Sequence, residues 1–112
     1  MSPAGLWLPY PVADLDEATA FYTDRVGLSI ADRWSTPGER GVVLAAGAAF
    51  VELVEPGDPR PTPLAFQLAD TADVDAAAVR LAGQPVRYPR GLYGFTTDGP
   101  AGARVMIWSE RE

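Results

Sequence analysis

The sequence predicts an α+β domain made of two similar modules, each with a strand, a helix and three further strands, whose curved mixed sheets surround a trough. Two observations support this. Val12-Ala13-Asp14 recurs half a chain later as Leu68-Ala69-Asp70, and Gly27 and Gly83 stand at the same spacing near the ends of two helical stretches. Each half also shows alternating apolar residues, then helical spacing, then alternation again.

The first module is expected over residues 5–55. Residues 6–12 alternate as a strand does, and Asp14 with Glu17 three positions later is typical of a helix N-terminus with a capping box. Apolar residues then recur with helical spacing until Gly27, which ends the helix. Strands are expected over 28–34, 40–46 and 48–55, because turn residues separate these apolar runs.

Residues 56–62 are rich in proline, which continues neither a helix nor a central strand, so they are predicted to form a linker. The second module, 63–110, repeats the pattern of the first. It is expected to hold a strand over 64–69, a helix from 70 or 71 that Gly83 closes, and three last strands. Those strands are placed at 86–88, 93–97 and 103–109, and the whole chain, 1–112, is interpreted as one domain.

Composition excludes several classes of function. The chain has no Cys and no His, so it can form neither a disulfide nor a Cys or His catalytic centre. Its formal net charge of −6 makes nucleic acid a poor partner. No apolar run is long enough for a membrane helix, and the N-terminus lacks the features of a signal peptide, so a cytoplasmic location is expected.

Several segments resemble one known superfamily. Residues 12–22 with Val26-Gly27-Leu28 resemble the opening of the glyoxalase, bleomycin-resistance and extradiol-dioxygenase superfamily, which has the vicinal oxygen chelate fold. Phe50-Val51-Glu52-Leu53 resembles the fourth strand of that family, and residues 64–78 resemble its second module. The resemblance implies the paired-module fold and a homodimer. It is specific to the fold, because this fold hosts many activities.

Metalloenzymes of that superfamily place one ligand on each of four strands, and the resemblance carries these positions to Trp7, Glu52, Pro63 and Met106. A lone carboxylate among such side chains is not a Zn²⁺ or Fe²⁺ site. The carry-over therefore argues against metal-dependent glyoxalase, dioxygenase and thiol transferase activities, and we expect no metal and no cofactor. Glu55 and Asp58 are interpreted as solvated charges at a strand end and in the linker.

Strand parity separates the side chains that face the trough from those that face the helices. The predicted ligand-binding residues of the trough are Trp7, Phe50, Glu52, Val54, Ala65, Gln67, Met106 and Trp108, with Trp34, Tyr88 and Tyr93 at its rim. Alternatives stay open for some of them. Trp7 and Trp108 either stack on a ligand or fill the space of a lost metal site. Glu52 either pairs with Arg87 or Arg104, or accepts hydrogen bonds from a ligand.

A mostly apolar hollow with a few polar groups is typical of a small-molecule site. The first hypothesis is therefore a non-catalytic protein that sequesters a small aromatic natural product or antibiotic, with cationic ligands favoured by the negative charge. It resembles the antibiotic-binding branch of the superfamily. The alternative is a metal-free enzyme of natural-product metabolism that uses Glu52 as its acid or base. A third hypothesis is a structural or regulatory domain with a filled trough.

Overall fold

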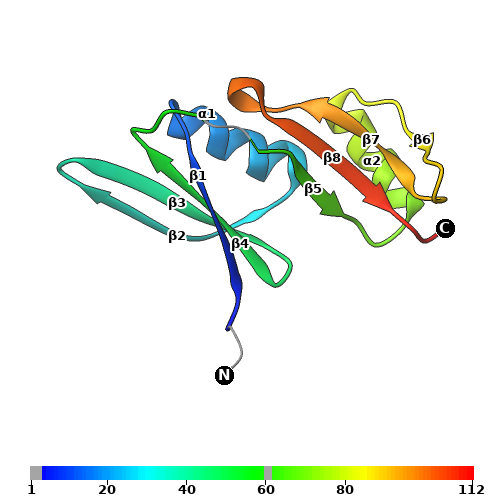
Figure 1. Cartoon of the computed structure of the whole chain (residues 1–112), viewed down its shortest axis with the longest axis horizontal. Helices are drawn as coiled ribbons and strands as arrows, with labels where there is room; N and C mark the ends of the chain where they lie inside the picture. The colour runs from blue at the N-terminus through cyan, green and yellow to red at the C-terminus, as the bar shows by residue number, and fades with distance from the viewer. Residues whose placement is uncertain (1–3, 60–61) are drawn as a thin grey trace. The chain divides into compact units, whose positions relative to one another are not determined.

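The computed structural model describes residues 4–59 and 62–112, and the chain divides into two compact units, Met1–Arg60 and Pro61–Glu112. Each unit contains one four-stranded mixed sheet and one main helix (Figure 1). The predicted α+β fold of two similar modules is confirmed. No helix in the part of the chain that the structure describes is long and apolar enough to cross a membrane.

The first unit follows the predicted order of elements. These are β1 (Leu6–Pro11), α1 (Leu15–Ala20), η1 (Phe21–Val26), β2 (Ser29–Thr36), β3 (Glu39–Ala46) and β4 (Ala49–Glu55). The strand order in the sheet is β1-β4-β3-β2, and β1 runs parallel to β4 while the other neighbours are antiparallel. β1 and β4 are separated by a helix and a hairpin, which supplies the long crossover that a parallel pair needs.

The second unit repeats this arrangement. Its elements are β5 (Leu64–Gln67), α2 (Thr71–Leu81), β6 (Val86–Arg87), β7 (Tyr93–Asp98), η2 (Pro100–Gly102) and β8 (Arg104–Ser109). The strand order β5-β8-β7-β6, with β5 parallel to β8, matches the order in the first sheet position by position. The same topology in both halves is what the internal repeat predicted.

Both helices begin at the predicted aspartates. The Asp14 side chain accepts a hydrogen bond from the backbone N–H of Glu17 at 3.0 Å, and the Asp70 side chain accepts one from Asp73 at 2.9 Å. Each carboxylate thus satisfies a backbone donor that the first helical turn leaves without a partner. The repeated Ala-Asp pair of the sequence is therefore a repeated N-cap.

The first helix does not stay α-helical up to Gly27, as its apolar spacing suggested. From Phe21 to Val26 it widens into π-type turns, and the N–H of Gly27 bonds to the carbonyl of Tyr22 at 3.0 Å. The hydroxyl of Thr23 donates to the Thr19 carbonyl at 2.9 Å, and so takes an acceptor that an α-helical N–H would use. Gly27 still ends the segment, in the left-handed conformation.

The second helix ends differently from the first. The left-handed residue at its C-terminus is Ala82, with φ +54°, and not Gly83 as the repeat predicted. Gly83 instead makes a close approach, because a Cβ there would lie 2.3 Å from Cδ2 of the buried Phe95. The glycine is thus needed for packing against the sheet, while an alanine carries the backbone strain.

Each unit has its own core between the helix and one face of its sheet. In the first unit α1 and η1 supply the buried residues Leu15, Ala18, Tyr22 and Val26, which cover the side of the sheet that holds Leu44 and Leu53. Burial raises the pKa of the Tyr22 hydroxyl, and the neighbouring Tyr10 raises it further. In the second unit α2 packs on β7 and β8 with Val74, Ala77, Ala78 and Leu81 against Phe95, Val105 and Ile107.

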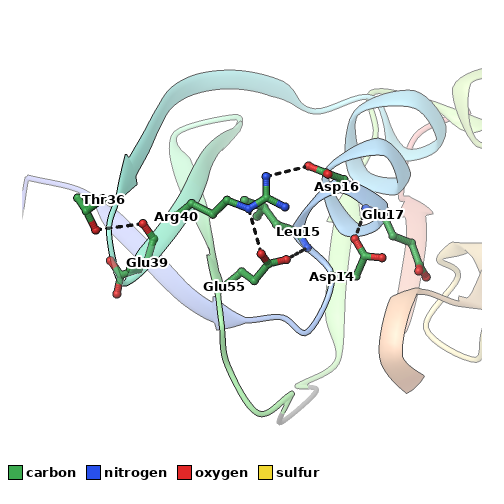
Figure 2. A network of polar contacts seen from close by, with 8 residues as sticks. All are labelled: Asp14, Leu15, Asp16, Glu17, Thr36, Glu39, Arg40 and Glu55. Atoms are coloured by element: carbon green, nitrogen blue, oxygen red, sulfur yellow. Dashed lines mark hydrogen bonds and ion pairs between the residues drawn. The ribbon is translucent and has the colours of Figure 1, made fainter.

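A carboxylate at the end of β4 ties the first helix to the sheet (Figure 2). Glu55 Oε2 accepts the N–H of Leu15 at 2.7 Å, and Oε1 accepts Nε–H of Arg40 at 2.9 Å. Arg40 also lies 3.4 Å from Asp16. Glu55 was expected to be a solvated loop charge, and this is wrong: only 23% of its side chain is exposed, and it joins β4, β3 and α1. Hydrogen bonds from Arg40 and Leu15 hold its pKa below the ordinary value.

The two residues after Leu81 give a paired test of the second helix end. Gly83→Ala should destabilise the protein by about 1–3 kcal/mol, because the new methyl group overlaps the Phe95 ring. Ala82→Gly should stabilise it by up to about 1 kcal/mol, because glycine adopts a positive φ without strain. Urea unfolding followed by circular dichroism measures both changes. Equal stabilities of the two variants would contradict these roles.

The Glu55 contacts predict a pH-dependent stability. Because the folded-state pKa of Glu55 is lowered, its contribution is present above the ordinary carboxyl pKa and is lost as the pH falls through the folded-state value. Glu55→Gln should therefore lower the melting temperature at neutral pH, and the gap to the wild type should close towards about pH 2. Glu110→Gln removes the same charge from an exposed site and serves as the control. A gap for Glu55→Gln that is independent of pH would refute this role.

Candidate functional site

The face of the first sheet that lies away from α1 carries most of the first module's predicted site. Residues that pair directly across strands share a face. Trp7 of β1 pairs with Phe50, and Phe50 pairs with Ala45. The next row crosses the sheet from Pro9 through Glu52 and Val43 to Asp32, and the last runs from Pro11 through Val54 and Gly41 to Trp34. We call these three rows the open face of the first sheet.

An aromatic stack lies at one corner of this open face. The rings of Trp7 and Phe50 have centroids 4.6 Å apart and planes inclined by 29°. Half of the Trp7 surface is exposed, at 50%, while Phe50 is half-buried beneath it. Within its own unit the indole ring is thus held in place by a neighbouring ring and keeps an aromatic face on which a flat molecule can stack.

A second tryptophan lies at the diagonal corner of the same face. The ring of Trp34 lies against Gly41, where a Cβ would be only 2.1 Å from Cη2 of the indole. Its Nε1–H donates to Glu39 Oε1 at 3.0 Å, so the indole has both an apolar support and a polar anchor. Position 41 therefore requires glycine, since any side chain would push the ring off the sheet.

The polar groups between the two tryptophans are both acidic. Glu52 is half-buried in the middle row, and among the described residues no hydrogen bond or ion pair engages its carboxylate. Asp32 flanks Val43 on the other side, and its Oδ1 accepts the N–H of Arg33 at 2.8 Å. The three rows contain no Lys or Arg. This face is therefore apolar, aromatic and negatively charged.

The two arginines considered as partners of Glu52 have other partners. Arg87 lies 2.7 Å from Glu112, and its guanidinium stacks over the Tyr93 ring at 4.9 Å from the centroid. Arg104 bonds to Asp98 at 2.5 Å and to the Thr96 hydroxyl at 2.9 Å. Each of these contacts is made within the second unit, so neither arginine is paired with Glu52.

The second sheet carries the rest of the predicted set on the face away from α2. Ala65 pairs with Met106, and Gln67 pairs with Trp108. Met106 and Trp108 are half-buried, whereas Ala65 and Gln67 are exposed on the edge strand. Gly94 of β7 lies beside Trp108, where a Cβ would meet the Trp108 Cβ at 2.9 Å. These four residues share one face of their own unit.

Two predicted rim residues are placed differently. Tyr93 pairs with the buried Ser109, on the face that α2 covers, and its hydroxyl donates to Asp75 Oδ1 at 2.6 Å. Tyr93, which was predicted at the rim of the trough, thus lies on the helix-covered face and joins the sheet to α2. Tyr88 lies beyond β6 in a turn, where its N–H bonds to the Leu92 carbonyl at 2.7 Å.

The four positions that correspond to metal ligands are equivalent in the two sheets. Trp7 lies two residues before the partner of Glu52, and Pro63 lies two residues before the partner of Met106. The donor set is one carboxylate and one thioether with an indole and a pyrrolidine ring, which does not fit a divalent cation. Among the described residues no group of three or more Asp or Glu side chains lies close enough together to hold a metal ion.

Asp32 was not among the predicted site residues. Strand β2 carries a register irregularity between Ile30 and Asp32, so simple alternation from the strand start gives no reliable face for this residue. The observed pairing with Val43 places it in the same row as Glu52. No feature of the sequence marks this irregularity, so only the strand pairing reveals the second carboxylate.

Comparison with known proteins gives one family. The sequence profile of the Glyoxalase/Bleomycin resistance protein/Dioxygenase superfamily matches residues 6–106. A comparison with curated protein sequences finds no significant match.

Solved structures of the same fold include proteins of different activities. A lactoylglutathione lyase from Agrobacterium tumefaciens has 24% identity and a TM-score of 0.74, with 97% of this chain and 96% of that one covered. TnmS3, an antibiotic-binding protein from Streptomyces sp. CB03234, has 20% identity and a TM-score of 0.74 over 97% and 98% of the two chains. A glyoxylase/bleomycin resistance protein/dioxygenase domain from Frankia sp. EAN1pec has 16% identity and a TM-score of 0.77 over 100% and 94%.

At these sequence identities the structural similarity shows a shared fold and does not show a shared activity. The profile match covers nearly the whole chain, and both described sheets have the topology that the resemblance implied. The chain belongs to the Glyoxalase/Bleomycin resistance protein/Dioxygenase superfamily.

Proposed function

We propose that this protein binds and sequesters a small, flat aromatic molecule that carries a positive charge, such as an antibiotic or another natural product, and that it does so without a metal ion. The observation that carries the proposal is the half-exposed Trp7 ring stacked on Phe50, next to a Glu52 carboxylate that no described residue engages. The function is binding alone.

The aromatic part of the proposal rests on the stack. An offset stack on a rigid ring adds about 0.5–1.5 kcal/mol beyond the apolar area that it buries. Trp7 is held by Phe50 before a ligand arrives, so little side-chain freedom is lost on binding. Trp34, which rests on Gly41, offers a second ring on the same face.

The preference for a cationic ligand rests on the two carboxylates of the middle row. Glu52 and Asp32 lie on either side of Val43, and no basic side chain shares the face with them. A cationic ligand would compensate Glu52 directly, and an anionic one would be repelled. The exposed indole favours the same ligands, because a cation over an aromatic face is attracted to it.

The absence of a suitable donor set supports binding without metal. The positions that match the ligands of the family's metalloenzymes hold an indole, a carboxylate, a proline ring and a thioether. The antibiotic-binding protein TnmS3 shares this fold, which supports the kind of ligand that we propose. The face of the second sheet that lies away from α2 carries Trp108 and Met106, and it is a further apolar and aromatic surface.

We also propose that the protein is a homodimer. Leu6 exposes 68% of its surface on the edge strand β1, a large exposure for an apolar side chain. Light scattering after size exclusion should give twice the chain mass of 11.9 kDa. A mass of one chain at micromolar concentration would refute the dimer and leave the ligand proposal standing.

The ligand proposal is tested with two flat probes of similar shape and different charge, cationic 9-aminoacridine and neutral acridone, together with bleomycin. Quenching of tryptophan fluorescence measures the affinity. The wild type should prefer 9-aminoacridine. Trp7→Leu should weaken the binding of both probes by about tenfold, because the stack and part of the buried apolar area are lost. Glu52→Gln should weaken only the cation, by about tenfold, through the lost charge-assisted contact.

Glu110→Gln is the matched control for Glu52→Gln, because it removes an exposed carboxylate that belongs to the second unit. Trp108→Leu tests the second sheet by itself. No quenching by any probe, together with no drug tolerance on expression, would overturn the proposal. Chemical conversion of a bound ligand that Glu52→Gln abolishes while binding survives would replace it by the enzymatic alternative.

A further inference from the structure

A hollow of the first unit lies between the start of α1 and the β2–β3 hairpin. Its volume is about 350 Å³, within the range of small-molecule sites. It is lined by Leu15, Asp16, Arg33, Trp34, Ser35, Arg40, Gly41 and Val42. All of these belong to the first unit, so the hollow is formed by that unit alone.

The floor of this hollow is apolar and its wall on β2 is polar. Leu15 and Val42 are buried core residues, 3% and 5% exposed. Arg33 pairs across the strands with Val42, and Ser35 pairs with Arg40, so these four side chains share one face of the hairpin. A guanidinium, a hydroxyl and a second guanidinium thus stand around an apolar base.

The two arginines that line the hollow have different contacts. Arg40 is compensated, because it bonds to Glu55 at 2.9 Å and lies 3.4 Å from Asp16, and Glu55 also holds the N–H of Leu15 (Figure 2). The Arg33 guanidinium, in contrast, makes no ion pair or hydrogen bond with any described residue, although its backbone N–H donates to Asp32. The formal charges of Arg33, Arg40, Asp16 and Glu55 sum to zero, but Arg33 is the guanidinium whose donors are not engaged by a described residue and can therefore meet a ligand.

We propose that this hollow binds a small organic monocarboxylate, whose carboxylate meets Arg33 and whose apolar body lies on Leu15 and Val42. Arginine suits this role because its planar donors match both oxygens of a carboxylate. The chain is acidic overall, so such a site is a local exception and selects its anion by contact rather than by long-range attraction.

This site differs from the one proposed above in its charged groups, although Trp34 and Gly41 belong to both linings. The open face holds Glu52 and Asp32 and favours cations, whereas the hollow holds Arg33 beside Leu15 and Val42 and favours an anion. The two sites therefore respond to different variants. Failure of either proposal leaves the other untouched.

The test is a titration of the full chain with benzoate, followed by the backbone amide signals in ¹H–¹⁵N NMR spectra. Saturable shifts should appear at Ser35, Gly41 and Val42. Arg33→Gln should weaken the affinity for benzoate about tenfold or more, since hydrogen bonds between charged groups contribute more to binding than hydrogen bonds between neutral groups. Arg90→Gln removes the same charge from an exposed position of the second unit and should leave the affinity unchanged. Preserved amide signals show that each variant is folded.

Two further probes separate the parts of the proposal. Neutral benzamide should bind at least about tenfold more weakly than benzoate if Arg33 recognises charge. Acetate should also bind more weakly, because it lacks an apolar body to cover Leu15 and Val42. Shifts that fail to saturate, or that Arg33→Gln and Arg90→Gln weaken equally, would overturn the site. Acetate binding as tightly as benzoate would overturn the assigned ligand class.

Discussion

Each sheet of this protein has four strands and one helix, and one helix can cover only one face of a sheet. Because side chains alternate along a strand, the residues of each strand fall into two sets, those that pack under the helix and those on the opposite face. The helix-covered faces hold Leu44, Leu53, Phe95 and Ile107, which are almost completely buried. The other faces, which no helix of their own unit covers, hold half-buried and exposed side chains such as Phe50 and Trp7 together with the buried Val43.

The binding function proposed for the protein rests on the side chains of the faces that no helix covers. In the first unit these are two indoles, a phenyl ring and two carboxylates, and none of these groups except the carboxylates can hold a divalent cation. The same scaffold, in solved structures of similar fold, belongs to a lactoylglutathione lyase and to an antibiotic-binding protein. Substitutions on one face can therefore change what the fold does while the core that maintains it stays intact.

The hollow proposed to bind a carboxylate lies where the cover of the first helix ends. α1 is short, and its first turn is attached to the sheet by the contacts of Glu55 and Arg40 as well as by the buried Leu15. Strand β2 extends beyond this cover and leaves Arg33 and Ser35 beside buried Leu15 and Val42. A helix that covered the hairpin completely would have closed this hollow. Arg40, which contacts Glu55 and Asp16, thus also lines the second proposed site.

The sequence by itself determined the topology, both N-caps, the boundaries of most strands and the division of side chains in regular strands, because these depend on local periodicity and capping. It did not determine four features that depend on distant contacts. Glu55 joins the helix to the sheet through its contacts with Leu15 and Arg40. Gly83 is needed because Phe95 leaves no room for a side chain. Tyr93 turns to α2 because Asp75 accepts its hydroxyl, and Asp32 joins Glu52 through an irregular strand pair. Only the tertiary structure brings these partners together, since no local pattern encodes which of many charged or aromatic side chains a residue will meet.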